Sequence, residues 1–211
     1  MDRRTLAVVA LVALVSLSGC ALLTGETLEF SANAATVSND TLQEARYDLR
    51  GVENQSISRT VEALGQERTI EATNWIATYE RNRSVESTGA VGTVVVVATP
   101  QMIVAGQAVN PVGKLSPRQL LGTISTAQRG LSNVAFRDNR TVTVLGEDAT
   151  VSVFEATTRV ADREVDVTVH LVRVAHGEDY VIGVAVHPSV MTAEQAGVDT
   201  MFAGIQHPTS G

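Results

Sequence analysis

Cysteine is almost absent from this chain of 211 residues, because Cys20 is the only one. A single cysteine excludes an intrachain disulfide. The folded part must therefore be held together by its hydrophobic core alone. About 180 residues follow the N-terminal region, and the chain is 44% hydrophobic, which is enough for one domain of ordinary size.

Lysine is equally scarce, since Lys114 is the only one and every other basic residue is arginine. Residues 1–19 contain Asp2, Arg3 and Arg4, so the rest of the chain carries 14 basic and 22 acidic side chains, a net charge of −8. No basic cluster remains to hold phosphates, which argues against nucleic-acid binding. The excess of acidic residues and the scarcity of lysine resemble the composition of haloarchaeal proteins. In those proteins an acidic surface aids solubility, and salt screens the repulsion between its like charges. A GC-rich genome with a mildly acidic surface is the alternative.

Recognisable catalytic motifs are also missing. The sequence has no Gly-x-Ser-x-Gly elbow, no glycine-rich phosphate loop and no dinucleotide fingerprint. The four histidines are His170, His176, His187 and His207. They lack the i,i+4 or cysteine-paired spacing of a metal site. We therefore predict no catalytic residue, no metal site and no cofactor.

The remaining polar residues favour structural roles. His170 shares the polar side of a predicted strand with Asp166 and Thr168, which allows a cross-strand carboxylate partner but favours a surface histidine. His187 and His207 each precede a proline and indicate caps at a strand end and a helix end. Carboxylates at 147–148 and 162–166 fall at predicted turns or on a polar strand face, where a solvated surface is expected.

The N-terminus has the three parts of a secretory signal peptide. A short charged segment with Arg3 and Arg4 precedes the apolar run from Leu6 to Leu17, and small residues follow. The run is too short for a spanning helix, which needs about 20 residues. The arginine pair also resembles a twin-arginine export signal, although any basic segment can contain two adjacent arginines.

Leu17-Ser18-Gly19-Cys20 resembles the lipobox of prokaryotic lipoproteins. That resemblance implies lipid on the Cys20 sulfur, removal of residues 1–19 and attachment to the outer face of the cell membrane. An uncleaved anchor or an ordinary cleavage site is the alternative. Residues 20–27 would form a tether whose first part reaches only about 20–25 Å when extended, and residues 28–211 a single domain.

The first half of this domain predicts mainly strands. Apolar and polar side chains alternate well enough in residues 28–37 to predict one strand, and Ser38 can cap a short helix. A long hairpin is expected from Ile57 to Tyr79 with its turn at Gly65. The run from Thr93 to Ala98 does not alternate, which indicates a strand buried on both faces.

The second half predicts a helix, a four-stranded meander and a closing helix. Ser116-Pro117-Arg118-Gln119 begins the first helix with a capping box. Strands at 141–145, 151–160, 165–174 and 180–186 alternate with short turns. Thr192-Ala193-Glu194-Gln195 is a second capping box, with Val198, Met201, Phe202 and Ile205 on the buried side. The order indicates an α+β fold: an antiparallel sheet of about seven or eight strands carrying two main helices.

The connection from Gln101 to Leu115 is apolar yet interrupted by glycine and proline, so it cannot be one regular element. It either plugs one end of the core, which is the favoured reading, or exposes a patch of the kind that marks binding sites. The residues that would form this ligand or partner surface are Met102, Ile103, Val109 and Pro111.

Four Asn-x-Ser/Thr triplets are candidate N-glycosylation sites in an exported protein. They begin at Asn39, Asn54, Asn82 and Asn139. Asn110 is followed by proline, which excludes it as an acceptor. Each triplet is common by chance, so occupancy does not follow from the motif.

The signal peptide, the lipobox, the acidic arginine-rich composition and the Asn110-Pro111-Val112-Gly113 stretch together resemble an uncharacterised family of haloarchaeal secreted lipoproteins. The element order loosely resembles the PsbP/Mog1-like sandwich, an analogy that transfers no function. The favoured hypothesis is a non-enzymatic surface lipoprotein that binds an unknown protein or small molecule or supports the envelope. A secreted hydrolase and an accessory ligand-binding lipoprotein of a transport system are the alternatives.

The lipobox makes a direct prediction about the mature protein. The intact mass should correspond to a chain that begins at Cys20 and carries a lipid adduct. The protein should also stay with the membrane, because lipid contributes about 0.8 kcal/mol per buried methylene and one or two chains hold a protein there. A chain that begins at Met1, or a soluble unmodified chain, would contradict it.

Overall fold

A computed structural model describes residues 27–63, 66–82, 90–104, 106–128, 130–160 and 163–208. The signal peptide, Cys20 and the predicted turn at Gly65 lie outside the described residues. The elements in chain order are β1 (Leu28–Ser31), β2 (Thr36–Val37), α2 (Asn39–Ala45), β3 (Asp48–Ala63), β4 (Gln66–Asn82), β5 (Ala90–Pro100), β6 (Ile103–Val104), β7 (Gln107–Ala108), the 3-10 helix η1 (Pro111–Gly113), α3 (Pro117–Gln128), β8 (Ser132–Val144), β9 (Glu147–Val160), β10 (Arg163–His176), β11 (Asp179–Pro188), α4 (Glu194–Ala203) and β12 (Ile205–Gln206).

One eight-stranded sheet dominates the structure, in the order β1-β4-β5-β11-β10-β9-β8, with β3 paired to β4. β3 covers one edge of β4 along most of its length, and β1 and β5 pair with different halves of the other edge. The neighbours are antiparallel except for β1 and β4, which are parallel. The sheet is therefore mixed, and the prediction of a purely antiparallel sheet is wrong at β1.

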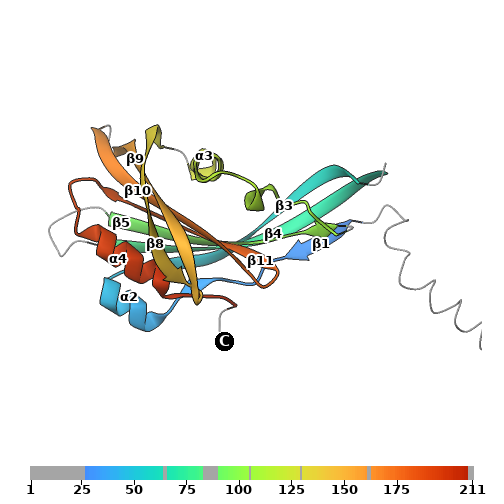
Figure 1. Ribbon diagram of the computed structural model, residues 1–211, viewed down its shortest axis with the longest axis horizontal. Helices are drawn as coiled ribbons and strands as arrows, with labels where there is room; N and C mark the ends of the chain where they lie inside the picture. Colours follow the sequence, from blue (N-terminus) through green and yellow to red (C-terminus); the bar gives the residue numbers. More distant parts are fainter. Residues whose placement is uncertain are drawn as a thin grey trace, which may run out of the picture.

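Helices cover both faces of the twisted sheet (Figure 1). α2 and α4 lie on one face and α3 on the other, so the described residues form the two main helices and the short helix after Ser38 that the sequence predicted. β2 and β12 form a separate two-stranded ladder next to α4, and β6 and β7 form another. No helix among the described residues is long and apolar enough to cross a membrane.

Local patterns predicted many of these elements correctly. The β3–β4 hairpin, the buried β5 and the meander from β8 to β11 are confirmed. Ser38 caps α2 by accepting a hydrogen bond from the Thr41 amide. The Ser116 Oγ accepts from the Gln119 amide at 3.4 Å while the Gln119 side chain accepts from the Ser116 amide at 2.9 Å, which confirms the first capping box.

Three predictions of local structure are wrong. The strand expected at 28–37 is interrupted after Ser31, because the Asn33 amide donates to the Asp179 carboxylate instead of continuing a ladder. β8 begins at Ser132 and not at Thr141, since register shifts before Ala135 and Asp138 disturb its alternation. The second capping box does not form: residue 193 precedes α4 without a side-chain hydrogen bond.

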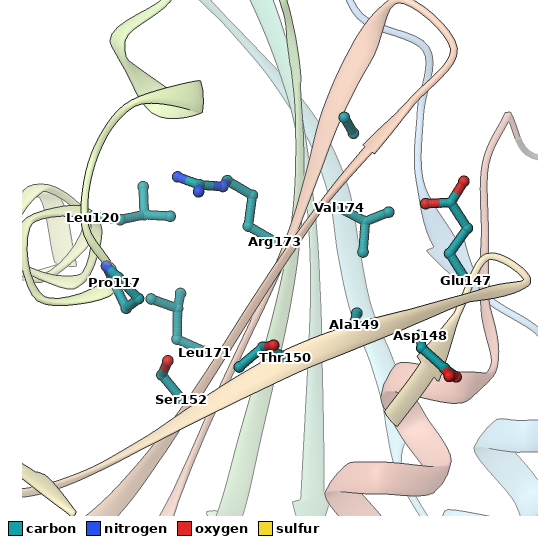
Figure 2. Close-up of a pocket in the computed structure, with 11 residues that line it drawn as sticks. Pro117, Leu120, Glu147, Asp148, Ala149, Thr150, Ser152, Leu171, Arg173 and Val174 are labelled. Carbon is teal, nitrogen blue, oxygen red and sulfur yellow. The ribbon is translucent and has the colours of Figure 1, made fainter. Parts of the chain in front are cut away.

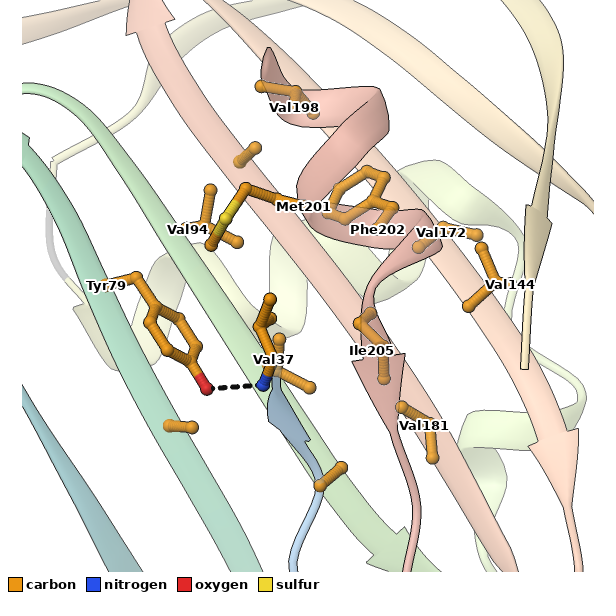
Figure 3. Close-up of a cluster of buried hydrophobic side chains, with 14 of the residues drawn as sticks. Val37, Tyr79, Val94, Val144, Val172, Val181, Val198, Met201, Phe202 and Ile205 are labelled. Carbon is orange, nitrogen blue, oxygen red and sulfur yellow. Dashed lines mark hydrogen bonds between the residues drawn. The ribbon is translucent and has the colours of Figure 1, made fainter. Parts of the chain in front are cut away.

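The larger core lies between α4 and the sheet (Figure 3). Val198, Met201 and Phe202 of α4 are all fully buried there, as the sequence predicted. Gly183 of β11 permits this packing, because a Cβ at that position would lie 2.7 Å from the Phe202 ring. A smaller core on the opposite face packs Leu120 and Leu121 of α3 against β9, β10 and β11.

Two buried tyrosines on the α4 face provide a matched test. Tyr79 Oη accepts a hydrogen bond from the Val37 amide at 2.8 Å (Figure 3), whereas Tyr47 Oη has no partner among the described residues. Burial, with the Glu194 charge adding, raises the pKa of Tyr47 to about 12.

We predict opposite effects when each hydroxyl is removed. Tyr79→Phe should lower the free energy of unfolding by about 1–3 kcal/mol, because it leaves the buried Val37 amide unsatisfied. Tyr47→Phe should leave stability unchanged or raise it by up to about 1 kcal/mol, because no bond is lost. Denaturant titration of both variants measures the difference, and equal losses would contradict the assignment.

Candidate functional site

Both carboxylates of α4 are held by arginines from the sheet. Arg81 of β4 donates to Glu194 Oε1 and Oε2 at 2.7 and 2.6 Å, and Glu194 is buried. Arg140 of β8 donates to Asp199 Oδ1 through Nε at 2.8 Å and Nη2 at 2.5 Å. A buried carboxylate without such a partner would be strongly destabilising. The two pairs therefore fix both the position and the rotation of α4.

Arg140 also begins a chain of hydrogen bonds through two buried histidines. Its Nη1 lies 2.9 Å from His170 Nδ1, His170 Nε2 lies 2.9 Å from His187 Nε2, and His187 Nδ1 lies 3.0 Å from the Pro188 carbonyl oxygen. Arginine can only donate, so His170 accepts at Nδ1 and carries its proton on Nε2. The proton on His170 Nε2 is then donated to His187, which donates in turn to the carbonyl.

The prediction that His170 is a surface residue is therefore wrong. Its side chain is 1% exposed. Its partners are Arg140 of β8 and His187 of β11, and not the cross-strand carboxylate that the sequence allowed. His187 does lie at the end of β11, but it is buried and bonded to His170 as well as to the next carbonyl.

A second polar cluster lies at the other end of the same face. His207 Nε2 donates to Asp179 Oδ2 at 3.0 Å, the same oxygen accepts from the Asn33 amide at 2.8 Å, and His176 Nδ1 lies 3.0 Å from His207 Nδ1. Asp179 is 1% exposed. His207 follows β12, not a helix, so its predicted role as a helix-end cap is also wrong.

These clusters connect structural elements and do not resemble a reaction centre. Among the described residues, the histidines contact arginine, aspartate, carbonyl oxygen or one another, and no serine, threonine or cysteine is hydrogen-bonded to them. The described part of the chain also contains no group of three or more residues placed to hold a metal ion. Each buried polar atom of these histidines has a protein partner, which is the arrangement that stabilises a buried network.

An open cleft of about 330 Å³ lies beside α3, where β9 and β10 stop pairing beyond Val151 and Val172 (Figure 2). Its lining also includes Ala149 and Val174 of the larger core. Pro117, Leu120 and Leu171 form an apolar wall. Glu147 and Asp148, the first two residues of β9, form an acidic rim. The lining is completed by Thr150, Ser152, Arg173 and Ala175. The volume lies at the lower end of the range of small-molecule sites.

Arg173 provides the positive charge of this cleft, and its side chain points toward α3 (Figure 2). Nη1 donates to the carbonyl oxygens of Val112 and Leu115, the latter at 2.9 Å. No carboxylate lies within 4.0 Å of it among the residues that the structure describes. Sequence reasoning missed Arg173, although an arginine within the Val-rich run of 165–174 is a signal.

The predicted surface at 101–115 forms the small β6–β7 hairpin and η1. Ile103 is 61% exposed, Pro111 is exposed, and Met102 and Val109 are half-buried. The four side chains are therefore not a plug beneath the sheet. Their role in binding stays a prediction, and none of them lines the cleft.

The last part of this connection is nevertheless held against the cleft. Arg173 fixes the carbonyls of residues 112 and 115. Gly113 lets η1 lie directly on Tyr180, because a Cβ there would come within 2.1 Å of the tyrosine hydroxyl. Asn110 is buried and donates to Thr99 and to the Pro100 carbonyl, so its role is structural.

The candidate glycosylation sites occupy different environments. Asn39 begins α2 and is exposed, and Asn54 is exposed on β3. Asn139 is exposed on β8, and its side-chain oxygen accepts from Ser152 Oγ at 2.9 Å. The side chain of Asn82 lies outside the described residues, as does Cys20.

The fold and the cleft define a mostly β protein, built on one mixed eight-stranded sheet with helices on both faces. The chain belongs to the family described as a domain of unknown function, DUF6517, whose model matches residues 34–206. This membership fits the predicted uncharacterised family. A solved structure of a Pseudomonas aeruginosa protein of unknown function is 11% identical, covers 72% of this chain and 99% of that chain, and has a TM-score of 0.32, which is too low to support an argument. No curated protein matches the chain.

The histidine chain predicts a specific dependence of stability on pH. Burial, and after it the charge of Arg140, lowers the pKa of His170 from 6.5 to about 3. The unfolded chain takes up a proton on this side chain as the pH falls below 6.5, whereas the folded protein stays neutral there. The contribution of His170 to stability is thus complete above 6.5 and is lost progressively toward pH 3.

His170→Gln should remove this dependence. The difference in unfolding free energy between wild type and variant should change by about 1.4 kcal/mol per pH unit across the window, the slope for one proton. Urea titrations from pH 7 to 4 measure it. If the unfolding free energies of the two proteins change in parallel with pH, His170 does not titrate in this way.

Proposed function

We propose that this protein is a lipid-anchored extracellular binding module and that the cleft beside α3 holds a small molecule with a carboxylate and a short apolar part. The observation that carries the proposal is the position of Arg173 in that cleft. Its guanidinium has no carboxylate partner among the described residues and faces the wall formed by Leu120 and Leu171. Arginine recognises carboxylates through paired hydrogen bonds.

The contrast between the two faces of the sheet supports this choice. On the α4 face, Arg81 and Arg140 are already paired with Glu194 and Asp199. On the α3 face, the bonds of Arg173 to other described residues are to neutral carbonyls, so its charge is available to a ligand. The acidic rim at Glu147 and Asp148 would repel a second anionic group and so orient the carboxylate inward.

The location follows from the lipobox and the short tether. β1 begins at Leu28, so few residues separate Cys20 from the sheet. A domain held this close to an outer membrane face would meet small solutes near the surface. The acidic, lysine-poor composition supports a haloarchaeal origin within this proposal, and the loose likeness to the PsbP/Mog1 sandwich belongs to it as well, without bearing on function.

Binding of hexanoate, a carboxylate with a short apolar tail, tests the cleft. Isothermal titration should detect hexanoate but not hexylamine, which has the same tail and the opposite charge. Thr150→Trp should weaken hexanoate binding at least tenfold, because Thr150 is an exposed lining residue and an indole there fills the space.

Thr192→Trp is the matched control, since residue 192 is exposed in the segment before α4 and does not line the cleft. It should bind hexanoate like the wild type. Equal binding of hexanoate and hexylamine, no binding of either, or equal effects of the two tryptophans would overturn the proposed cleft.

A further inference from the structure

β3 has an unpaired edge. One side of the strand pairs with β4 from Asp48 to Ala63, and no described strand lies on the other side. Every side chain from Val52 to Thr60 is exposed. A long, regular free edge is a template for pairing with another chain unless something blocks it.

Proline, lysine and β-bulges, which commonly block such an edge, are absent from most of it. β3 contains neither proline nor lysine. Its one register shift lies between Leu49 and Gly51, so the strand from Gly51 to Ala63 pairs with β4 without interruption. Ile57 remains 46% exposed in the middle of it. The backbone is therefore free to continue the sheet.

The charges of β3 select one partner. Apart from Asp48 at its start, the charged residues of β3 are Arg50, Glu53, Arg59 and Glu62. They are spaced by three, six and three residues, so their pattern changes sign when the strand is reversed. Consider a second copy that pairs antiparallel with this strand, with Ser56 of one copy opposite Ser56 of the other. Glu53 of each copy then lies opposite Arg59 of the other, and residue 50 of each lies opposite residue 62 of the other. Directly opposite residues of unlike charge stabilise a strand pair, and like charges destabilise it.

Registers shifted by three residues in either direction lose this match. Pairing that places residue 50 opposite 59, or 53 opposite 62, brings like charges together. Glu53 and Arg59 have no ion-pair partner within 4.0 Å among the described residues, whereas Arg50 already contacts Glu80 in its own chain at 2.8 Å. The Glu53–Arg59 pair, formed twice about the two-fold axis, therefore decides the register.

We propose that two copies of this chain associate through β3, antiparallel and centred on Ser56, and so join their sheets into one. Glu53, Ile57 and Arg59 lie opposite Ile76, Ala72 and Ile70 of β4, which puts all three on one face of the strand. In the pair, the two Ile57 side chains are diagonal neighbours and fill the centre, with an ion pair on either side. The residues at the centre of this interface, 52–60, are all exposed in the monomer.

Cross-linking tests the register. In the complete chain with Cys20→Ser, Ser56→Cys should form a disulfide-linked dimer under mild oxidation, because directly opposite Cα atoms in antiparallel strands lie about 4.5–5.5 Å apart. Ser58→Cys is the matched control: residue 58 faces Asn54, and its two copies lie about 14 Å apart. The protein is made in a host without N-glycosylation, since a glycan on Asn54 would cover the edge.

Charge reversal tests the selection of the partner. Glu53→Arg and Arg59→Glu should each weaken dimerisation at least tenfold in analytical ultracentrifugation at moderate salt, and the double variant should recover it. Glu155→Arg, the same change at an exposed residue of β9, should have no effect. No Ser56→Cys cross-link, equal cross-linking of Ser58→Cys, or a double variant no better than the single ones would overturn the proposal.

Discussion

The attachment of α4 to the sheet through two arginine–carboxylate pairs is the constraint on which the rest of the structure depends. Arg81 and Arg140 come from distant strands and hold Glu194 at the start of the helix and Asp199 near its middle. Because the helix has no side-chain N-cap, these pairs and the buried Met201 and Phe202 determine its position. The histidine chain from Arg140 extends the same network into β10 and β11.

This constraint divides the chemistry of the molecule between two faces. On the α4 face, hydrogen bonds inside the protein occupy the carboxylates of α4 and the buried histidines, and a satisfied buried network rigidifies its surroundings. On the α3 face, the sheet is only partly covered, and Arg173 lies in a cleft open to solvent. The hydrogen-bonded α4 face thus acts as the scaffold, and the open cleft beside α3 acts as the binding site. Binding sites are commonly held in place by a rigid scaffold in this way.

The elements that the sequence predicted are those that local patterns determine. The caps at Ser38 and Ser116 and the meander turns involve residues a few positions apart. The features it missed depend on contacts between distant segments: the Asn33 amide reaches Asp179 across 146 residues, and Arg81 reaches Glu194 across 113. A histidine on an alternating strand looks exposed until the strand next to it and the helix above it are known. The same limit applied to the cleft, because α3 and β10 meet only in the folded chain.

A chemical-shift map of the amide groups during titration with hexanoate tests the central claim most directly, because it reports both faces in one measurement. The account predicts shifts confined to Leu120, Thr150, Arg173 and their neighbours on α3, β9 and β10. Shifts centred on His170, His187 or α4, with an unaffected cleft, would contradict it and would assign the binding chemistry to the network described here as structural.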